Sequence, residues 1–300
     1  MKRKTIVKYS LIGVLLIGVG GLTGFIVKRA TGQTVVDYSS FNPDDYKADS
    51  KLLLRQYENN PNRSFSEAEL VNIALEKYRC CENSYSIGIG VASTVVSQTI
   101  RNAQIKNGNQ YFEESISRSS MVDIANRAYQ VGIDNGVTLN KGKANSSEEA
   151  TYDEAKKTEF TSQNYKDAYG KTLDEMFIYI ISNKTVLKEG CSKTKLDSGE
   201  MKIVLELNPD TSTYYYKHQM QSISNLDSLP TFKSLTHTYV VDSKMNLIYS
   251  KVNEEYKASM GITVNIKNTI EYYYHPNEYY EIPDSKTQIN YSIEGEVQYE

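Results

Sequence analysis

Residues 262–274 read ITVNIKNTIEYYY, and this stretch decides the fold class. Apolar and aromatic side chains alternate with polar ones from Ile262 to Tyr274. Because successive side chains of a strand point to opposite faces of a sheet, this period of two predicts a strand with one buried face and one solvated face. Such one-sided burial is typical of antiparallel sheets, so the stretch favours an antiparallel architecture.

The segments before this strand extend the same pattern into a meander. Residues 236–241 and 247–257 are predicted as strands, with turns at 242–246 and 258–261. Further upstream, the turn Asn107-Gly108-Asn109 joins two predicted strands at 98–106 and 110–118, which indicates a hairpin. The C-terminal meander and this hairpin together predict a sheet of many antiparallel strands.

A helix start precedes the first strand. Ser66 and Glu69 have the spacing of a capping box, and apolar residues follow at helical intervals to about residue 79. A strand is then predicted at 85–92, with Ile87 and its alternate neighbours on one face. The small residues Gly88 and Gly90 lie on the other face, where another element could approach closely.

The middle of the chain mixes both kinds of element. Residues 121–130 are ambiguous between strand and helix. The pattern predicts short strands at 137–139, 177–182 and 201–207, helices at 147–157, 162–175 and 211–226, and one more strand before Pro283. We find no internal repeat, so one α+β domain over residues 66–283 is the economical interpretation.

The N-terminus predicts a membrane anchor. Residues 1–8 are rich in lysine and arginine, and an uncharged run of 19 residues follows at 9–27, about the length needed to cross a bilayer. The run is long for a signal peptide and ends in a poor cleavage site, so a retained anchor is favoured. The positive-inside rule places 1–8 in the cytoplasm and the domain outside the cell membrane. Residues 30–65 are predicted as a stalk, and 284–300 as a loosely attached polar tail.

Composition excludes one class of partner. The chain has 34 basic and 37 acidic residues and a formal charge of −3, without the basic surface that nucleic acid requires. It has 25 tyrosines and no tryptophan. Tyrosine favours strands, so we interpret most of these residues as sheet packing and not as an aromatic binding wall.

Reactive residues give no catalytic signature. The cysteines are Cys80, Cys81 and Cys191, and the histidines are His218, His237 and His275. The odd count is compatible with two states. In one, Cys191 forms a disulfide with Cys80 or with Cys81, and in the other all three cysteines are free thiols. No spacing typical of a nucleophile, a metal site or a phosphate loop is present. The sequence therefore predicts a protein that is not an enzyme and that uses no metal or cofactor.

Two segments carry a resemblance to a known family. One is residues 69–116, with its helix, strand and hairpin. The other is residues 239–283, where Val240-Val241-Asp242-Ser243-Lys244 opens a strand pair that ends at Glu281-Ile282-Pro283. Their arrangement resembles the LolA/LppX-like lipoprotein carrier superfamily. The resemblance implies a curved antiparallel half-barrel that wraps around helices and holds an acyl chain between them.

The inward row of the sheet supplies the predicted binding residues. The candidates for a pocket lining are Ile87, Ile89, Val91, Ile262, Val264, Ile266, Ile270 and Tyr272. We expect this lining to bind a hydrophobic or amphiphilic, lipid-like ligand without catalysis, because burying apolar area favours binding. The same row could also be an ordinary filled core. The alternative function is then an interaction module that binds a protein or glycan at the cell surface.

Overall fold

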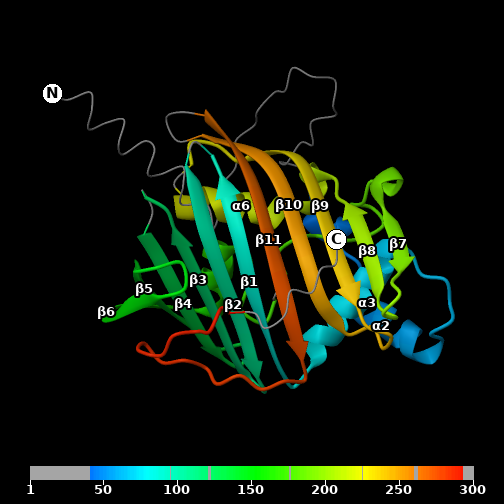
Figure 1. Cartoon of the computed structure of the whole chain (residues 1–300), viewed down its shortest axis with the longest axis horizontal. Helices are drawn as coiled ribbons and strands as arrows, with labels where there is room; N and C mark the ends of the chain where they lie inside the picture. Colours follow the sequence, from blue (N-terminus) through cyan, green and yellow to red (C-terminus); the bar gives the residue numbers. More distant parts are fainter. Residues whose placement is uncertain are drawn as a thin grey trace.

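A large curved sheet dominates the computed structural model, which describes residues 41–94, 96–120, 123–175, 177–224, 226–259 and 263–292. The sheet has eleven antiparallel strands in the order β6-β5-β4-β3-β2-β1-β11-β10-β9-β8-β7. The first and last strands of the chain therefore meet in the middle, and two arms extend from them (Figure 1). The α+β class and the antiparallel sheet predicted from the sequence are confirmed.

The arms follow the chain order. One arm contains β1 (Asn83–Ser93), β2 (Ser97–Asn107), β3 (Gln110–Arg118), β4 (Asp123–Val131), β5 (Val137–Ala144) and β6 (Ala150–Phe160). The other contains β7 (Ser192–Lys195), β8 (Met201–Glu206), β9 (Thr231–Val241), β10 (Leu247–Ser259) and β11 (Thr263–Pro276). The predicted hairpin corresponds to β2 and β3, and the predicted meander to β9, β10 and β11.

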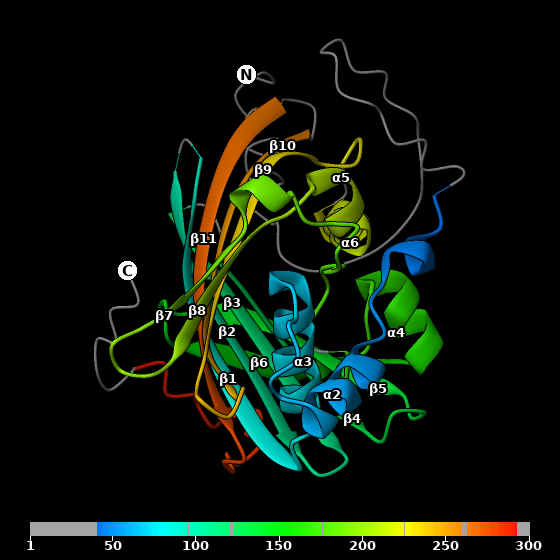
Figure 2. The ribbon, with the colours of Figure 1, turned by 90° about the vertical axis from the view of Figure 1, so that its right-hand side faces the viewer.

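The helices lie on one side of the sheet, its concave face (Figure 2). They are α2 (Ser50–Asn59), α3 (Glu67–Cys80), α4 (Ser162–Tyr169), α5 (Pro209–Ser212) and α6 (Tyr214–Ser224), with short 3₁₀ turns η1 (Pro43–Tyr46) and η2 (Lys188–Gly190). The predicted capping box starts α3: the Ser66 hydroxyl accepts from the Glu69 amide, and the Glu69 carboxylate accepts from the Ser66 amide.

Two predicted elements in the middle of the chain are wrong. Residues 147–157 were predicted as a helix, but β6 runs through Ala150–Phe160. Its lysines and glutamates are common in helices, and pairing with β5 overrides that propensity. Residues 177–182 were predicted as a strand, but they cross the concave side of the sheet without joining it. The predicted strand before Pro283 is also absent from the described residues.

The folded body begins before Ser66, inside the segment that we expected to be a stalk. Helix α2 packs on α3: Leu53, Leu54 and Tyr57 contact the core, and the Ser50 hydroxyl donates to the Asn72 side chain at 2.9 Å. The predicted anchor at 9–27 lies outside the described residues. None of the helices in the described part of the chain combines the length and the apolar composition of a membrane span.

The convex face carries a separate core under the C-terminal segment. Ile289 and Tyr291 are almost fully buried and pack with Ile87, Phe112 and Ile116. The tail predicted to be loosely attached is therefore docked as far as residue 292, and its last eight residues, 293–300, lie outside the described part of the chain. Strands β1, β2 and β3 therefore bury apolar side chains on the convex face.

Candidate functional site

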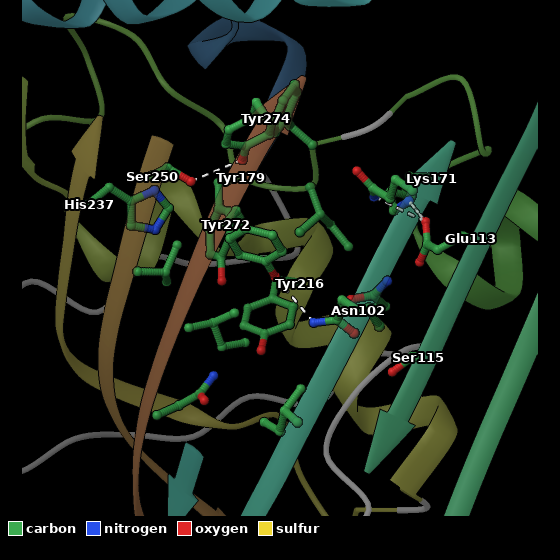
Figure 3. A pocket seen from close by; sticks show the side chains of 18 of the residues that line it. Asn102, Glu113, Ser115, Lys171, Tyr179, Tyr216, His237, Ser250, Tyr272 and Tyr274 are labelled. Carbon is green, nitrogen blue, oxygen red and sulfur yellow. Dashed lines mark hydrogen bonds and ion pairs between the residues drawn. The ribbon is translucent and has the colours of Figure 1, made fainter. Parts of the chain in front are cut away.

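The concave face of the sheet encloses a cavity of about 150 Å³. It lies where two core clusters meet, since Tyr179 and Tyr272 pack against both. Figure 3 shows these rings around the space, with Tyr216 of α6 below them. Strands β2, β3, β9, β10 and β11 supply its walls, and residues 177–179 close it on the helix side. The cavity is thus built by both arms of the sheet.

Two glycines of β1 make room for the aromatic wall. In the sheet register Gly88 is opposite Tyr272, and Gly90 is opposite Ile270. A Cβ atom on Gly88 would lie 2.6 Å from Tyr272 Cε1, and one on Gly90 would lie 2.7 Å from Ile270 Cγ1. Such contacts are too short for any side chain. The sequence predicted that another element could approach the face of β1 that carries Gly88 and Gly90. Tyr272 and Ile270 of β11 approach this face.

A second cavity of about 290 Å³ lies on the other side of residues 177–179, next to α2 and α3. Lys171, Phe177, Ile178 and Tyr179 line both spaces. The segment between the cavities is fixed at its ends. The Lys171 ammonium donates to Glu113, and the Ile181 carbonyl accepts from Asn72 at 2.9 Å.

A buried carboxyl group lies on β10 beside the first cavity. Glu254 accepts hydrogen bonds from Tyr179 and from Asn268 (3.1 Å), with a longer contact to Tyr216 at 3.5 Å. Burial disfavours its charged form and raises its pKa to about 7, although these donors favour the carboxylate. Glu254 therefore changes its charge near neutral pH, inside the protein.

His237 lines the cavity from β9. Its Nδ1 is hydrogen-bonded to the Tyr239 hydroxyl at 2.9 Å, and its ring packs edge-on against Tyr179 with 4.5 Å between centroids. Burial lowers its pKa to about 3, so the imidazole is neutral at physiological pH. The His237 ring points from its strand toward Tyr272 (Figure 3).

The walls differ in polarity. Phe177 and Ile178 present an apolar wall on the helix side, whereas the sheet presents polar groups among its apolar and aromatic side chains, including Ser250 and Asn268 on β10 and β11. The polar groups of β2 and β3 are Asn102, Gln104, Glu113, Ser115 and Ser117. Gln104 donates to Glu113 at 3.3 Å, and the Glu113–Lys171 ion pair closes this end (Figure 3). The cavity therefore has an apolar wall at residues 177 and 178 and polar groups along the sheet.

The eight residues predicted to line one pocket lie in different places in the structure. Ile270 and Tyr272 line the first cavity. Ile266 and Val264 belong to the neighbouring core cluster, and Ile262 lies outside the described residues.

Ile87, Ile89 and Val91 lie on the convex face, which corrects their assignment to the inward row. The register pairs them with Tyr273, Glu271 and Thr269, the alternate residues of β11. Directly opposed residues share a face, so these three point away from Ile270 and Tyr272. Val91 is 45% exposed, whereas Ile87 is buried under the C-terminal segment.

Sequence reasoning missed most of the polar lining. His237 was weighed only as the partner of a cysteine, and Glu254 and Asn268 were not singled out. A signal was present for the last two, because Glu254 and Asn268 occupy the core-facing register of otherwise apolar strands. A polar residue at a core-facing position suggests a buried hydrogen-bond network.

The cysteines take no part in the cavity. Cys80, Cys81 and Cys191 are unpaired thiols. The sequence was compatible with one disulfide or with three free thiols, and the structure favours the free thiols. Burial raises the pKa of Cys80 and Cys191, so neither is activated as a thiolate.

Known proteins give no further assignment. No protein-family model matches the chain, and no curated protein matches it.

Proposed function

We propose that the concave face of this sheet binds an amphiphilic, lipid-like molecule and does not alter it. The observation that carries the proposal is the cavity between the sheet and residues 177–179, with an apolar wall at residues 177 and 178 and polar groups along the sheet. A curved open antiparallel sheet with helices on its concave face fits the resemblance to the LolA/LppX-like carriers, and we propose on that basis that the concave face holds an apolar chain. An interaction module with a filled core, the alternative function, needs no such space.

The size of the cavities limits the bound state. Binding sites for small molecules usually enclose about 300–1,000 Å³. The first cavity, at about 150 Å³, is smaller than this range, and the second, at about 290 Å³, is near its lower limit. A ligand with a long chain would therefore occupy both spaces, which requires residues 177–179 to move aside.

The location is part of the proposal. With the run at 9–27 as a retained anchor, the domain would be held outside the cell membrane. A tethered binding domain would act as a stationary acceptor or sensor for lipids near that surface. It would not act as a diffusing shuttle.

A cavity-filling substitution tests the proposal. Ser115 lines the cavity from β3, so Ser115→Phe would place a ring in the space. The full chain is titrated with N-phenylnaphthylamine, an uncharged apolar probe whose fluorescence rises when it leaves water. We expect saturable binding to the wild type and about tenfold weaker binding to Ser115→Phe, because the lost apolar contact area is worth about 1–2 kcal/mol.

Val91→Phe is the matched control, because it adds the same ring on the convex face. We expect its affinity for the probe to equal that of the wild type. Equal affinity in all three proteins would mean that the probe does not enter the cavity, and absence of saturable binding to the wild type would contradict the proposal itself.

A further inference from the structure

Two buried polar atoms at the cavity have no partner among the described residues. They are His237 Nε2 and Asn268 Oδ1, on side chains that line the cavity. His237 is 1% exposed and Asn268 is 5% exposed. Buried polar atoms in folded proteins nearly always have hydrogen-bond partners, so these two indicate a partner that the chain itself does not supply.

The sheet register fixes how far apart these two groups lie. His237 of β9 is opposite Val252 of β10, and Asn268 of β11 is opposite Glu254 of the same strand. The two residues are therefore two strands apart and offset by two residues along the strands, or about 12 Å between backbones at the usual strand and residue spacings. Their side chains share the concave face. A partner that reaches both needs more than one polar group.

We infer that the cavity recognises the uncharged polyol head group of an amphiphile, of the size of glycerol, through His237 Nε2 and Asn268 Oδ1. This inference rests on the proposed function. A hydroxyl group both donates and accepts, so it satisfies the Asn268 oxygen and either tautomer of His237. A volume of about 150 Å³ also suits a small head group, since an engineered cavity of that size binds benzene.

The charges around the cavity favour a neutral head group. Lys171 and Glu113 are paired with each other, which leaves neither charge for a ligand. Glu254 already accepts from Tyr179 and Asn268, and an anionic head group at Asn268 would lie beside that carboxyl group. A cationic head group would place its charge against a neutral imidazole in a desolvated site, because the Glu254 carboxyl group does not line the cavity and already accepts from Tyr179 and Asn268.

The chain of the ligand would leave the head-group site along the apolar wall. Phe177, Ile178 and Tyr179 line both cavities, so a chain that passes them reaches the second space beside α2 and α3. The polyol would then lie at the sheet, and the chain would lie under the helices.

A series of ligands with one chain and different head groups tests the inference. Monodecanoylglycerol, decanoate and decylammonium are compared, at pH 8, by their displacement of N-phenylnaphthylamine from the full chain. We expect monodecanoylglycerol to displace the probe at about tenfold lower concentration than either charged ligand, since it alone satisfies the two orphaned atoms.

Three variants locate the preference. His237→Phe and Asn268→Leu each remove one of the two atoms, and we expect each to abolish most of the tenfold preference for the glycerol ester. Asn265→Leu, the same change at an exposed position on the other face of β11, leaves both atoms in place, so it serves as the control and should keep the preference. If one variant fails to fold, the other still tests the inference.

The outcomes separate the inference from the proposed function. Displacement by all three ligands at similar concentrations, or a preference that survives both variants, would overturn the polyol site while leaving lipid binding intact. If the probe does not bind the wild type, both fail together.

Discussion

His237 lines the first cavity and Glu254 lies beside it, and burial shifts their pKa values in opposite directions. The native Glu254 keeps its proton up to about pH 7, whereas an unfolded glutamate loses it near 4.5. Its contribution to stability is therefore full below 4.5 and is lost as the pH rises to 7. Native His237 takes up a proton only near pH 3, against 6.5 in the unfolded chain, so its contribution is full above 6.5 and is lost as the pH falls.

Between pH 4.5 and 6.5 these two effects oppose each other, each at about 1.4 kcal/mol per pH unit. Glu254→Gln removes the effect that lowers stability as the pH rises. We therefore expect the free energy of unfolding of this variant to rise with pH about 1.4 kcal/mol per unit more steeply than that of the wild type. His237→Phe should make the free energy of unfolding fall with pH by a similar amount. Urea unfolding across this pH range measures both slopes. Slopes equal to that of the wild type would show that these groups titrate normally.

At the scale of single elements, the C-terminal segment holds the convex face together through a buried ion pair. Arg127 of β4 and Glu114 of β3 are opposite each other and are 0% and 1% exposed. The guanidinium donates to Glu114 and to the carbonyls of Asp284 and Thr287, while Tyr291 donates to Glu114 at 2.7 Å. The segment thus covers the pair and supplies three of its hydrogen bonds, and Tyr152 of β6 donates another to Glu114 at 2.6 Å.

Removing one member of this pair leaves the other charge buried and unpaired. We expect Arg127→Met to lower the free energy of unfolding by about 3–5 kcal/mol. The double variant Glu114→Leu/Arg127→Met should recover most of that loss, because no charge is left behind. Chemical denaturation measures both proteins. The exposed Arg118 provides a control, and Arg118→Met should change stability by less than about 0.5 kcal/mol.

A double variant as unstable as Arg127→Met would contradict this explanation. The stability of the region would then depend on the packing of the arginine side chain and its contacts to the C-terminal segment, and not on compensation of charge.

The elements that the sequence predicted well are those with local signals. The alternation in residues 262–274, the turn at Asn107-Gly108-Asn109 and the capping box at Ser66 depend on nearby residues. The structure places β11, the β2–β3 hairpin and α3 there. The β6 strand was missed because its charged residues resemble a helix, and only pairing with β5 makes it a strand.

At the scale of the whole molecule, the face of a strand could not be predicted from its alternation alone. Ile87 and Ile270 are both buried, but one lies under the C-terminal segment and the other faces the cavity. Because both faces of the central strands are covered, an apolar residue does not tell which face it occupies. The small residues Gly88 and Gly90 were the better guide, since they marked the face approached by Tyr272 and Ile270.

The polar part of the cavity was unpredictable for a related reason. His237, Glu254 and Asn268 come from three adjacent strands of the β9–β11 meander, and their meeting depends on the register between strands. Sequence spacing within one strand does not contain that register. Two arms of the sheet and the segment 177–179 must assemble before His237 and Asn268 line one space, with Glu254 beside it.

The central claim is that an apolar chain binds on the concave face, and the position of a heavy atom on that chain tests it most directly. The full chain would be crystallised with a decanoylglycerol that carries a terminal bromine, and the bromine located by its anomalous scattering. We predict a bromine position within the two cavities on either side of Phe177, Ile178 and Tyr179. A bromine on the convex face near Val91, or none in the crystal, would contradict the account.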